Sequence, residues 1–335
     1  MRVLDLGRAS DDASDGVVEV GNIARVMMQG LVDLQINGVQ GVDFNSASLS
    51  RDDWNRALQA LKEDGTEAFL PTVITDSIPA LMRKLDGLAG LCELDGVSFI
   101  GGGSRPVGIH LEGPYLSEKP GYIGAHPQAH AKDASLEEMK RLCDAARGWI
   151  KLVTLAPERD VGGKTTRWLV DQGVLVAAGH TDASLDELKR GIDAGLSLFT
   201  HLGNACPPSV PRHDNIVNRA IALRDSLKIT LIADGHHLPL WLIESWVGIF
   251  GVDRVAIVSD AISAALLPPG LHRLGDQVVA VGEDGVPRSE DRTHFVGSGA
   301  TLGMMAGLLR RETSLSEESL AQMLRKNPIR WLGIA

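Results

Sequence analysis

Histidine and carboxylate side chains stand at the ends of several short apolar runs in this sequence. In GIHLEGPYLSEKPGYIGAHP, residues 108–127, Glu112 closes an apolar run and His126 closes the loop that follows. His180 ends GVLVAAGH, and His201 lies in SLFTHLGNA. Imidazole and carboxylate groups are ligands that zinc and iron accept, and three protein ligands leave a position open for water. We therefore predict one divalent metal ion held by Glu112, His180 and His201.

A metal that activates water needs a proton acceptor beside it, and this group must later pass the proton to the leaving group. Asp260, near the end of RVAIVSDA, is the candidate. Two structural alternatives remain open: Asp is also a favoured helix N-cap, and Glu112 could form a salt bridge with Arg or Lys. A lone histidine at a strand end is often structural, but several together favour catalysis.

The first and fourth apolar runs argue for a single metal ion. Barrel hydrolases that hold two ions often begin with His-x-His on the first strand and carry a modified lysine on the fourth. Here the first run offers Gln35 and Asn37, and Lys151 stands at the beginning of its run instead of the end. Glu112 is then the only carboxylate ligand that we predict.

The elements that would bring these side chains together alternate along the chain. Apolar runs of strand length are separated by segments with the 3.6-residue spacing of helices, such as residues 51–65. Ser184 and Glu187 have the spacing of a capping box at the start of another helix. This alternation predicts a (β/α)8 barrel with its active site at the C-terminal strand ends, and an open doubly wound sheet is the alternative. The eight runs are residues 30–38, 67–75, 106–113, 150–157, 173–180, 197–205, 228–235 and 254–261.

The composition argues against several kinds of partner. The chain has 335 residues and a formal net charge of −10, without a cluster of Lys and Arg, so we expect neither nucleic acid nor an anionic membrane. Its three cysteines have no metal-like spacing, and their odd number favours a reducing compartment. The N-terminus turns acidic at once, and no apolar run approaches the ~20 residues of a membrane helix. We expect a cytoplasmic protein with one barrel domain, residues 30–335, after a segment 1–29.

Seven short motifs follow one another between residue 30 and about residue 331. They are GLVDLQINGVQGVDFN, GIHLEGPYL with its downstream GAHP, AAGHTDAS, FTHLGNACPP, IADGHH, VSDA and VGSGATL. In type and order they resemble the N-acetylglucosamine-6-phosphate deacetylase family of the amidohydrolase superfamily. The resemblance implies a homodimeric enzyme that releases acetate from N-acetylglucosamine 6-phosphate. It also implies one divalent ion, for which we expect zinc and keep iron or another divalent ion as alternatives.

The resemblance assigns roles residue by residue. Glu112, His180 and His201 match the metal ligands, Gln35 matches the residue beside the water at the metal, and Asp260 matches the catalytic acid and base. The substrate residues it implies are Ala125 and His126 for the acetyl-bearing part, the backbone at Asn204 and Ala205 with Arg212 and His237 for the phosphate, and Phe295, Val296 and Gly297 around the sugar. In the family the arginine reaches the ligand of the neighbouring subunit; the alternative for Arg212 is a solvated loop residue.

Some segments depart from the family pattern. Family members usually have a longer N-terminal portion and continue past NPIRWLGIA, and the two ends form a small β-sandwich that we expect to be reduced or missing here. MMQGLVD, Gly203 and the surroundings of HFVGSG also differ. Because these changes spare the metal residues, an amidohydrolase for a different amide, either an unphosphorylated amino sugar or a specialised metabolite, remains the alternative. A catalytically inactive sugar-phosphate binding protein is disfavoured, since all four metal and acid–base residues are present.

Overall fold

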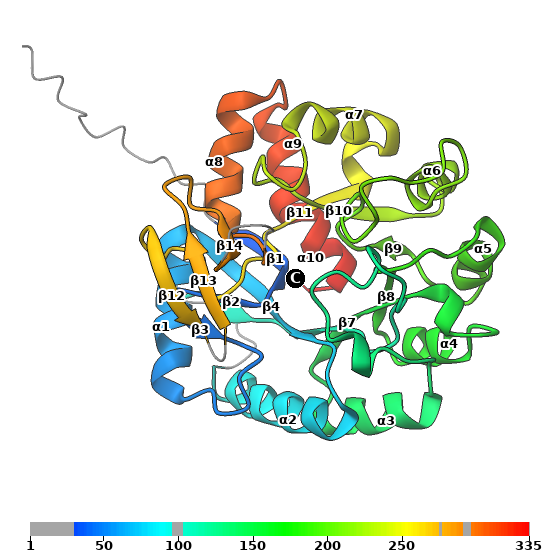
Figure 1. Ribbon diagram of the computed structural model, residues 1–335, viewed down its shortest axis with the longest axis horizontal. Coiled ribbons are helices and arrows are strands. Elements are labelled where there is room, and N and C mark those ends of the chain that lie inside the picture. The colour runs from blue at the N-terminus through cyan, green and yellow to red at the C-terminus, as the bar shows by residue number, and fades with distance from the viewer. Residues whose placement is uncertain (1–29, 96–102, 275–276, 291–295, 335) are drawn as a thin grey trace, which may run out of the picture.

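A barrel of parallel strands forms the centre of the molecule. The structure is a computed structural model that describes residues 30–95, 103–274, 277–290 and 296–334. Each strand pairs in parallel with the next barrel strand along the chain, and helices surround the strands (Figure 1). In order, the barrel strands are β1 (Leu31–Ile36), β4 (Thr66–Ile74), β6 (Ile109–Glu112), β7 (Ile150–Leu155), β8 (Leu175–Ala178), β9 (Leu198–Phe199), β10 (Lys228–Ile232) and β11 (Val255–Val258).

The last strand returns to the first, which closes the barrel at its C-terminal rim. Asp260 N–H donates to the Gln35 carbonyl (2.9 Å), and Asn37 N–H donates to the Ala261 carbonyl (2.7 Å). A parallel bridge also joins Ile36 to Ala261. Each of the eight predicted apolar runs overlaps one barrel strand, so the predicted (β/α)8 fold is confirmed and the open sheet is not.

The outer layer consists of helices, several of which begin at polar caps. Ser50 accepts a hydrogen bond from Asp53 N–H at the start of the first helix, and Ser184 forms the predicted capping box with Glu187. These helices are α1 (Arg51–Asp64), α2 (Ile78–Asp95), α3 (Leu136–Ala145), α4 (Lys164–Asp171), α5 (Leu185–Asp193), α6 (Ile216–Ala222), α7 (Leu240–Phe250), α8 (Leu302–Glu312), α9 (Glu317–Ala321) and α10 (Asn327–Leu332). Short turns η1 (Gln128–His130), η2 (Pro157–Arg159), η3 (Val252–Arg254) and the π-helix η4 (Gln322–Lys326) complete them.

A small antiparallel sheet follows the last barrel strand, and the sequence did not lead us to expect it. Its strands are β12 (Gly270–Leu274), β13 (Gln277–Val281) and β14 (Pro287–Ser289). Val279 and Val281 pack on Ala264, with Ile262 and Val296 beside them. Two further short strands, β2 (Gly38–Val39) and β3 (Val42–Asp43), pair with each other, and β5 (Arg105–Pro106) pairs with β4.

Of the two chain ends that we expected to form a reduced β-sandwich, only the C-terminal one lies among the described residues. The N-terminal part, residues 1–29, lies outside the described residues, as does Phe295 of the predicted sugar loop. At the other end, residues 317–332 form α9, η4 and α10. In this described C-terminal portion the chain is helical and adds no strand to a sandwich.

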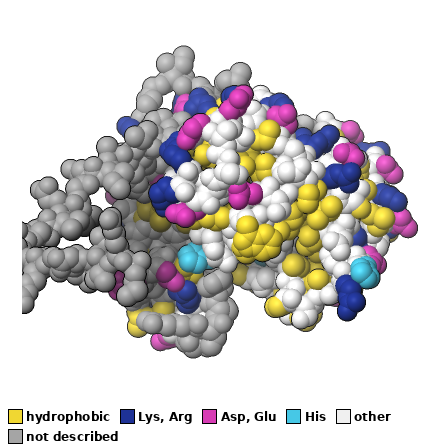
Figure 2. Space-filling view, turned by 90° about the horizontal axis from the view of Figure 1, so that it is seen from above, with side chains coloured by type: hydrophobic (Ala, Val, Ile, Leu, Met, Phe, Trp, Pro, Cys, Tyr) yellow, Lys and Arg dark blue, Asp and Glu magenta, His cyan; other side chains and the backbone are white. Residues whose placement is uncertain are grey.

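The described surface carries charges of both signs. Figure 2 shows the side that is uppermost in Figure 1, where Lys and Arg side chains alternate with Asp and Glu around a band of hydrophobic side chains. The view therefore presents no continuous basic patch on this described face. Among the described helices, none combines the length and the apolar composition that a membrane crossing requires.

A buried carboxyl group lies within the barrel, beneath the rim. Asp33 in β1 is 1% exposed, and its Oδ1 accepts hydrogen bonds from Ser259 N–H (3.1 Å) and Gln35 N–H (3.2 Å). Burial raises the pKa of Asp33 to about 7, against the opposing effect of these hydrogen bonds. The folded protein therefore binds this proton more tightly than the unfolded chain does. The resulting stabilisation is complete below roughly pH 4 and is lost as the pH rises through about 7.

Replacement of Asp33 by asparagine should remove this pH dependence. The Oδ1 of asparagine can still accept both main-chain N–H groups, but the side chain cannot ionise. Between roughly pH 5 and pH 8 we expect the free energy of unfolding of the wild type to fall by roughly 2 to 3 kcal/mol relative to that of Asp33→Asn. Urea unfolding of both proteins over this range measures the difference. A difference that stays constant with pH would show that Asp33 is ionised in the folded protein throughout.

Candidate active site

Three of the predicted side chains are set at strand ends by an uncommon backbone conformation. The three residues are in the left-handed region, each two residues beyond the end of its strand: His180 (φ 49°), His201 (φ 34°) and Asp260 (φ 45°). A residue other than glycine in this region costs about 1 to 3 kcal/mol, and such residues gather at functional sites. The repeated strain indicates that the direction of these three side chains is selected for function.

The carboxylate of Glu112 is the centre of the cluster. Its oxygens lie 3.0 Å from His201 Nε2, 3.3 Å from His180 Nε2 and 3.6 Å from His126 Nε2, and Gln35 Nε2 donates to it at 3.1 Å. Burial raises the pKa of Glu112, but its interactions with the three neighbouring imidazoles outweigh burial and hold the pKa well below its usual value. Because its described partners are these groups, the alternative of a rim salt bridge with Arg or Lys is wrong.

The chemistry of this donor set fits a divalent metal ion. One donor atom each from Glu112, His126 and His180 can be chosen so that all lie within 4.8 Å of one another, and all three residues are buried. His201, also buried, brings a fourth donor to the same carboxylate. A buried carboxylate faced by several imidazole nitrogens is a set that zinc and similar ions accept.

The hydrogen bonds at Nδ1 distinguish His180 from His126. Nδ1 of His180 lies 2.9 Å from the Tyr122 carbonyl, which can only accept, so this nitrogen carries the proton and Nε2 offers its lone pair to the cluster. Nδ1 of His126 instead accepts from Thr75 N–H (3.3 Å), so in the neutral ring Nε2 carries the proton. Burial lowers the pKa of His126 to about 4, which keeps the ring neutral. The Nε2 of His180 can therefore serve as a ligand atom, and the Nε2 of His126 can serve as a hydrogen-bond donor.

Asp260 lies beside the cluster and is held by two amide side chains. Its Oδ1 accepts hydrogen bonds from Asn37 Nδ2 (2.8 Å) and Gln35 Nε2 (3.2 Å). Burial, together with the negative charge of Glu112, raises the pKa of Asp260 to about 6. No helix begins at this described segment, so the N-cap alternative is wrong. A carboxyl group with a pKa near neutrality suits both the acceptance and the release of a proton.

Comparisons with known proteins agree with this geometry. The N-acetylglucosamine-6-phosphate deacetylase of Bacillus subtilis (strain 168) is 31% identical over 316 residues, which cover 92% of this chain and 76% of that protein. A solved structure of an N-acetyl-D-glucosamine-6-phosphate deacetylase mutant from Mycobacterium smegmatis, in complex with N-acetyl-D-glucosamine-6-phosphate, matches with a TM-score of 0.80 and 30% identity; the match covers 92% of this chain and 78% of that one. No protein-family model matches the sequence.

The chain belongs to the N-acetylglucosamine-6-phosphate deacetylase family. It is thus an amidohydrolase of the deacetylase type, as its motifs implied. A protein from Shewanella sp. (strain ANA-3) with the name N-acetylgalactosamine-6-phosphate deacetylase is 29% identical over 311 residues, which cover 91% of this chain and 74% of that protein. Relatives of this deacetylase are therefore named for two epimers of the amino sugar.

The residues that this deacetylase was expected to use for the phosphate lie on loops after β9 and β10. Asn204 N–H already donates to the His201 carbonyl (2.9 Å), whereas Asn204 Nδ2 is buried and has no hydrogen-bond partner among the described residues. The side chain of Asn204 is therefore the donor that a ligand could use. Ala205 follows in the left-handed region (φ 52°). Arg212 is exposed and forms no ion pair with any described residue.

His237 is oriented by a buried acid that the sequence analysis did not single out as a site residue. Asp234 Oδ2 lies 2.6 Å from His237 Nδ1, and Asp234 Oδ1 accepts from the main-chain N–H groups of His236 and His237. Burial raises the pKa of Asp234, but the His237 hydrogen bond and charge outweigh it and lower the value to about 2. Asp234 is thus ionised at neutral pH and fixes the His237 ring through its Nδ1 atom.

The remaining predicted substrate residues lie at two places. Ala125 is exposed on the loop that carries His126. Val296 and Gly297 are half-buried, and the residue after them, Ser298, forms a parallel bridge to Ala261 beside Asp260. The structure therefore brings these two described members of the sugar loop to the rim of the barrel.

Two residues that position the cluster escaped the sequence analysis. Thr75 ends the run EAFLPTVIT, so the rule that drew attention to other strand ends would also have found it. Tyr122 contributes a main-chain carbonyl to His180, and no side-chain signal can reveal such a role.

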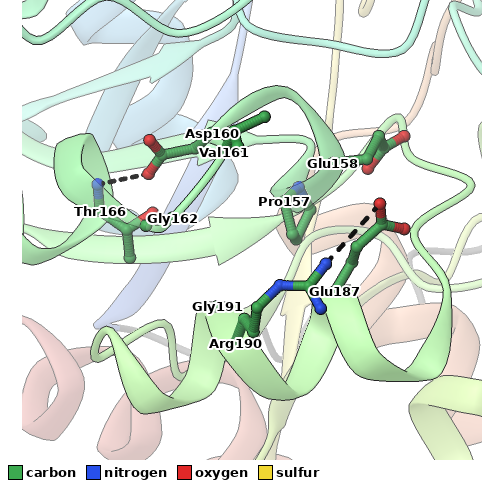
Figure 3. Close-up of a pocket in the computed structure, with 10 residues that line it drawn as sticks. Pro157, Glu158, Asp160, Val161, Gly162, Thr166, Glu187, Arg190 and Gly191 are labelled. Carbon is green, nitrogen blue, oxygen red and sulfur yellow. Dashed lines mark hydrogen bonds and ion pairs between the residues drawn. The ribbon is translucent and has the colours of Figure 1, made fainter.

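A cavity of about 140 Å³ lies outside this cluster, between the segment after β7 and α5 (Figure 3). Polar groups on its wall are already engaged: Asp160 accepts from Thr166 N–H (2.8 Å) at the start of α4. Glu158, also on the wall, accepts from Asp182 N–H (3.0 Å). The hydrogen bond between Glu158 and Asp182 therefore stabilises the turn that directly follows His180.

Proposed function

We propose that the protein hydrolyses the acetamide bond of N-acetylglucosamine 6-phosphate and gives glucosamine 6-phosphate and acetate. The observation that carries the proposal is the buried Glu112 carboxylate faced by imidazoles, with Asp260 beside it on a separate strand end. Membership of the deacetylase family supports the acetylated hexosamine 6-phosphate as the class of substrate. The galacto epimer is the second candidate, because a relative of similar identity is named for it.

The metal site that we propose consists of Glu112, His180 and His201, with zinc as the ion. Zinc supplies Lewis acidity to such a site and lowers the pKa of water there. The tautomer of His180 and the left-handed backbone shared by His180 and His201 support this ligand set. Gln35, which donates to Glu112, holds the carboxylate in place.

The chain's own groups account for the proton transfers. Asp260 takes a proton from the attacking water and later gives it to the nitrogen of the departing amino sugar, so that the amide C–N bond breaks as the new C–O bond is retained in acetate. Asn37 and Gln35 hold the Asp260 carboxylate in place through the hydrogen bonds that they donate to it. His126, with its proton on Nε2, donates to the carbonyl oxygen of the acetyl group, where negative charge develops.

The sugar phosphate is recognised by the loops after β9 and β10, at the same rim. Arg212 and His237 bind the phosphate, and Asn204 and Ala205 border it. A guanidinium can form two parallel hydrogen bonds to a phosphate, and the exposed Arg212 is available for them. Ala125, Val296 and Gly297 line the acetyl and sugar positions; Phe295, predicted with them, lies outside the described residues.

Acetate release over a panel of substrates tests this function. The panel pairs the N-acetylated gluco and galacto sugars with their 6-phosphates, and uses the zinc-loaded enzyme. The gluco 6-phosphate should be the best substrate by kcat/KM. Preference for the galacto 6-phosphate would move the assignment to the other epimer, and no turnover of any amino sugar would favour a different amide.

Arg212→Ala should weaken use of the phosphorylated sugar and spare the plain sugar. Each charge-assisted hydrogen bond that is lost contributes roughly 1.5 to 3 kcal/mol, so KM for the 6-phosphate should rise at least tenfold. The plain sugar is an internal control because it cannot use the contact, and Arg224→Ala is the matched variant of another exposed arginine. Equal losses on both substrates would show that Arg212 supports the fold.

The same residue tests the homodimer that we propose. If Arg212 reaches the site of the partner subunit, a mixture of Arg212→Ala and Asp260→Asn chains contains hybrid dimers in which one site keeps both residues. At a 6-phosphate concentration well below the raised KM, subunit exchange should then give more activity than either variant has alone. A monomeric mass in light scattering, or a mixture without recovery, would place Arg212 in its own site.

A further inference from the structure

Thr75 makes two contacts with the same nitrogen of His126. It lies directly after β4 and is 1% exposed. Its main-chain N–H donates to His126 Nδ1 at 3.3 Å, and its hydroxyl oxygen lies 2.9 Å from that nitrogen. His126 reaches this position from the far end of the loop after β6, 51 residues along the chain.

The main-chain contact determines which nitrogen of His126 carries the proton. A main-chain N–H can only donate, so Nδ1 must accept, and in the neutral ring the proton is on Nε2. Nε2 points into the cluster, 3.6 Å from Glu112 Oε2. A protonated Nε2 can donate a hydrogen bond to a carbonyl oxygen, but it has no lone pair for a metal ion.

The neighbouring backbone leaves space for the hydroxyl. Thr75 Oγ1 also lies 3.4 Å from the Glu112 carbonyl. A Cβ atom at Gly113, where φ is 92°, would lie 2.1 Å from Thr75 Oγ1. The glycine that follows Glu112 therefore keeps open the place that the threonine hydroxyl occupies.

We propose that Thr75 is a positioning residue that fixes His126 as a hydrogen-bond donor to the substrate and keeps it from acting as a metal ligand. The proposal rests on the proposed function for the identity of the substrate. It explains how His126 can lie 3.6 Å from Glu112, against 3.3 Å for His180, and still serve a different purpose. The hydroxyl contributes by holding the ring, and the main-chain N–H contributes by fixing the tautomer.

The tautomer can be measured without activity. In zinc-loaded protein labelled with 15N-histidine, long-range 1H–15N correlations distinguish rings protonated at Nδ1 from rings protonated at Nε2. The signal that disappears in His126→Gln identifies His126. We expect the proton on Nε2 for His126 and on Nδ1 for the ligand His180. A proton on Nδ1 of His126 would overturn the proposal, whether or not the enzyme deacetylates N-acetylglucosamine 6-phosphate.

Kinetics of two Thr75 variants test the role of the hydroxyl. Thr75→Val removes it at similar volume and retains the main-chain N–H, so kcat should fall roughly tenfold to a hundredfold while KM changes by less than about threefold. Thr75→Ser keeps a hydroxyl and should restore kcat to within about threefold of the wild type. Zinc content should stay near one equivalent in all three proteins.

Thr72→Val is the matched control within β4. The Thr72 hydroxyl accepts from Ile36 N–H (3.0 Å) and does not contact a histidine of the cluster, so its loss should lower Tm and leave kcat unchanged. A purely structural Thr75 would behave in the same way, with a lower Tm and a normal kcat in Thr75→Val, and this result would refute the proposal. If Thr75→Val does not fold, a wild-type kcat in Thr75→Ser together with the Nε2 tautomer still supports it, and a Thr75→Ser kcat reduced tenfold at normal Tm contradicts it.

Discussion

Asp260→Asn should retain the metal ion and lose at least a hundredfold in kcat. The amide oxygen of asparagine can still accept from Asn37 and Gln35, so the geometry around position 260 should persist. The amide cannot take a proton from water at neutral pH, and general acid–base groups contribute on the order of a hundredfold to ten-thousandfold. Acetate release and elemental analysis of the same preparation measure the two properties.

Asp253→Asn provides the comparison for this variant. Asp253 is exposed in η3, at the opposite end of β11 from Asp260. Asp253→Asn therefore removes one negative charge, as Asp260→Asn does, but leaves the site unchanged. We expect this control to have normal kcat and normal metal content. Near-normal turnover in Asp260→Asn would exclude proton transfer by Asp260, and loss of metal from Asp260→Asn would assign it to the ligands.

Replacement of single histidines should identify the metal ligands. We expect His180→Asn and His201→Asn to bind zinc more than about a hundredfold more weakly, because even the loss of a group behind a ligand often costs tenfold to a hundredfold. His126→Asn should keep about one equivalent of zinc while its kcat falls, because the Nε2 of His126 carries a proton. Competition with a chromophoric chelator gives the affinities.

The outcome separates two ligand sets that both contain Glu112. His213→Asn, at an exposed position, controls for the loss of a histidine elsewhere. If His126→Asn loses the metal and His201→Asn keeps it, the ion is held by Glu112, His126 and His180. One donor atom from each of these three residues lies within 4.8 Å of the others. The tautomer that we infer for His126 would then be wrong, and Thr75 would orient a ligand instead of a donor.

The barrel could be predicted from the sequence because its causes are local. Parallel strands covered by helices are buried on both faces, so each appears as a continuous apolar run, and capped amphipathic segments separate the runs. Since active sites of barrels lie at the C-terminal strand ends, the ends of these runs also marked Glu112, His180, His201 and Asp260. The sheet β12–β14 was missed because β12 and β14 lack a continuous apolar run and the run VVAV in β13 is short.

Only the tertiary structure shows which ring nitrogen of His126 and of His180 carries the proton. His126, His180 and His201 are the same residue type, and residue type does not reveal which ring nitrogen carries the proton. That choice depends on the atom behind each ring: the Tyr122 carbonyl behind His180 and the Thr75 N–H behind His126. Both atoms belong to the main chain, which is chemically the same at nearly every residue. Their effect arises from where the folded loops place them, so the sequence alone determined the set of groups and the fold determined their roles.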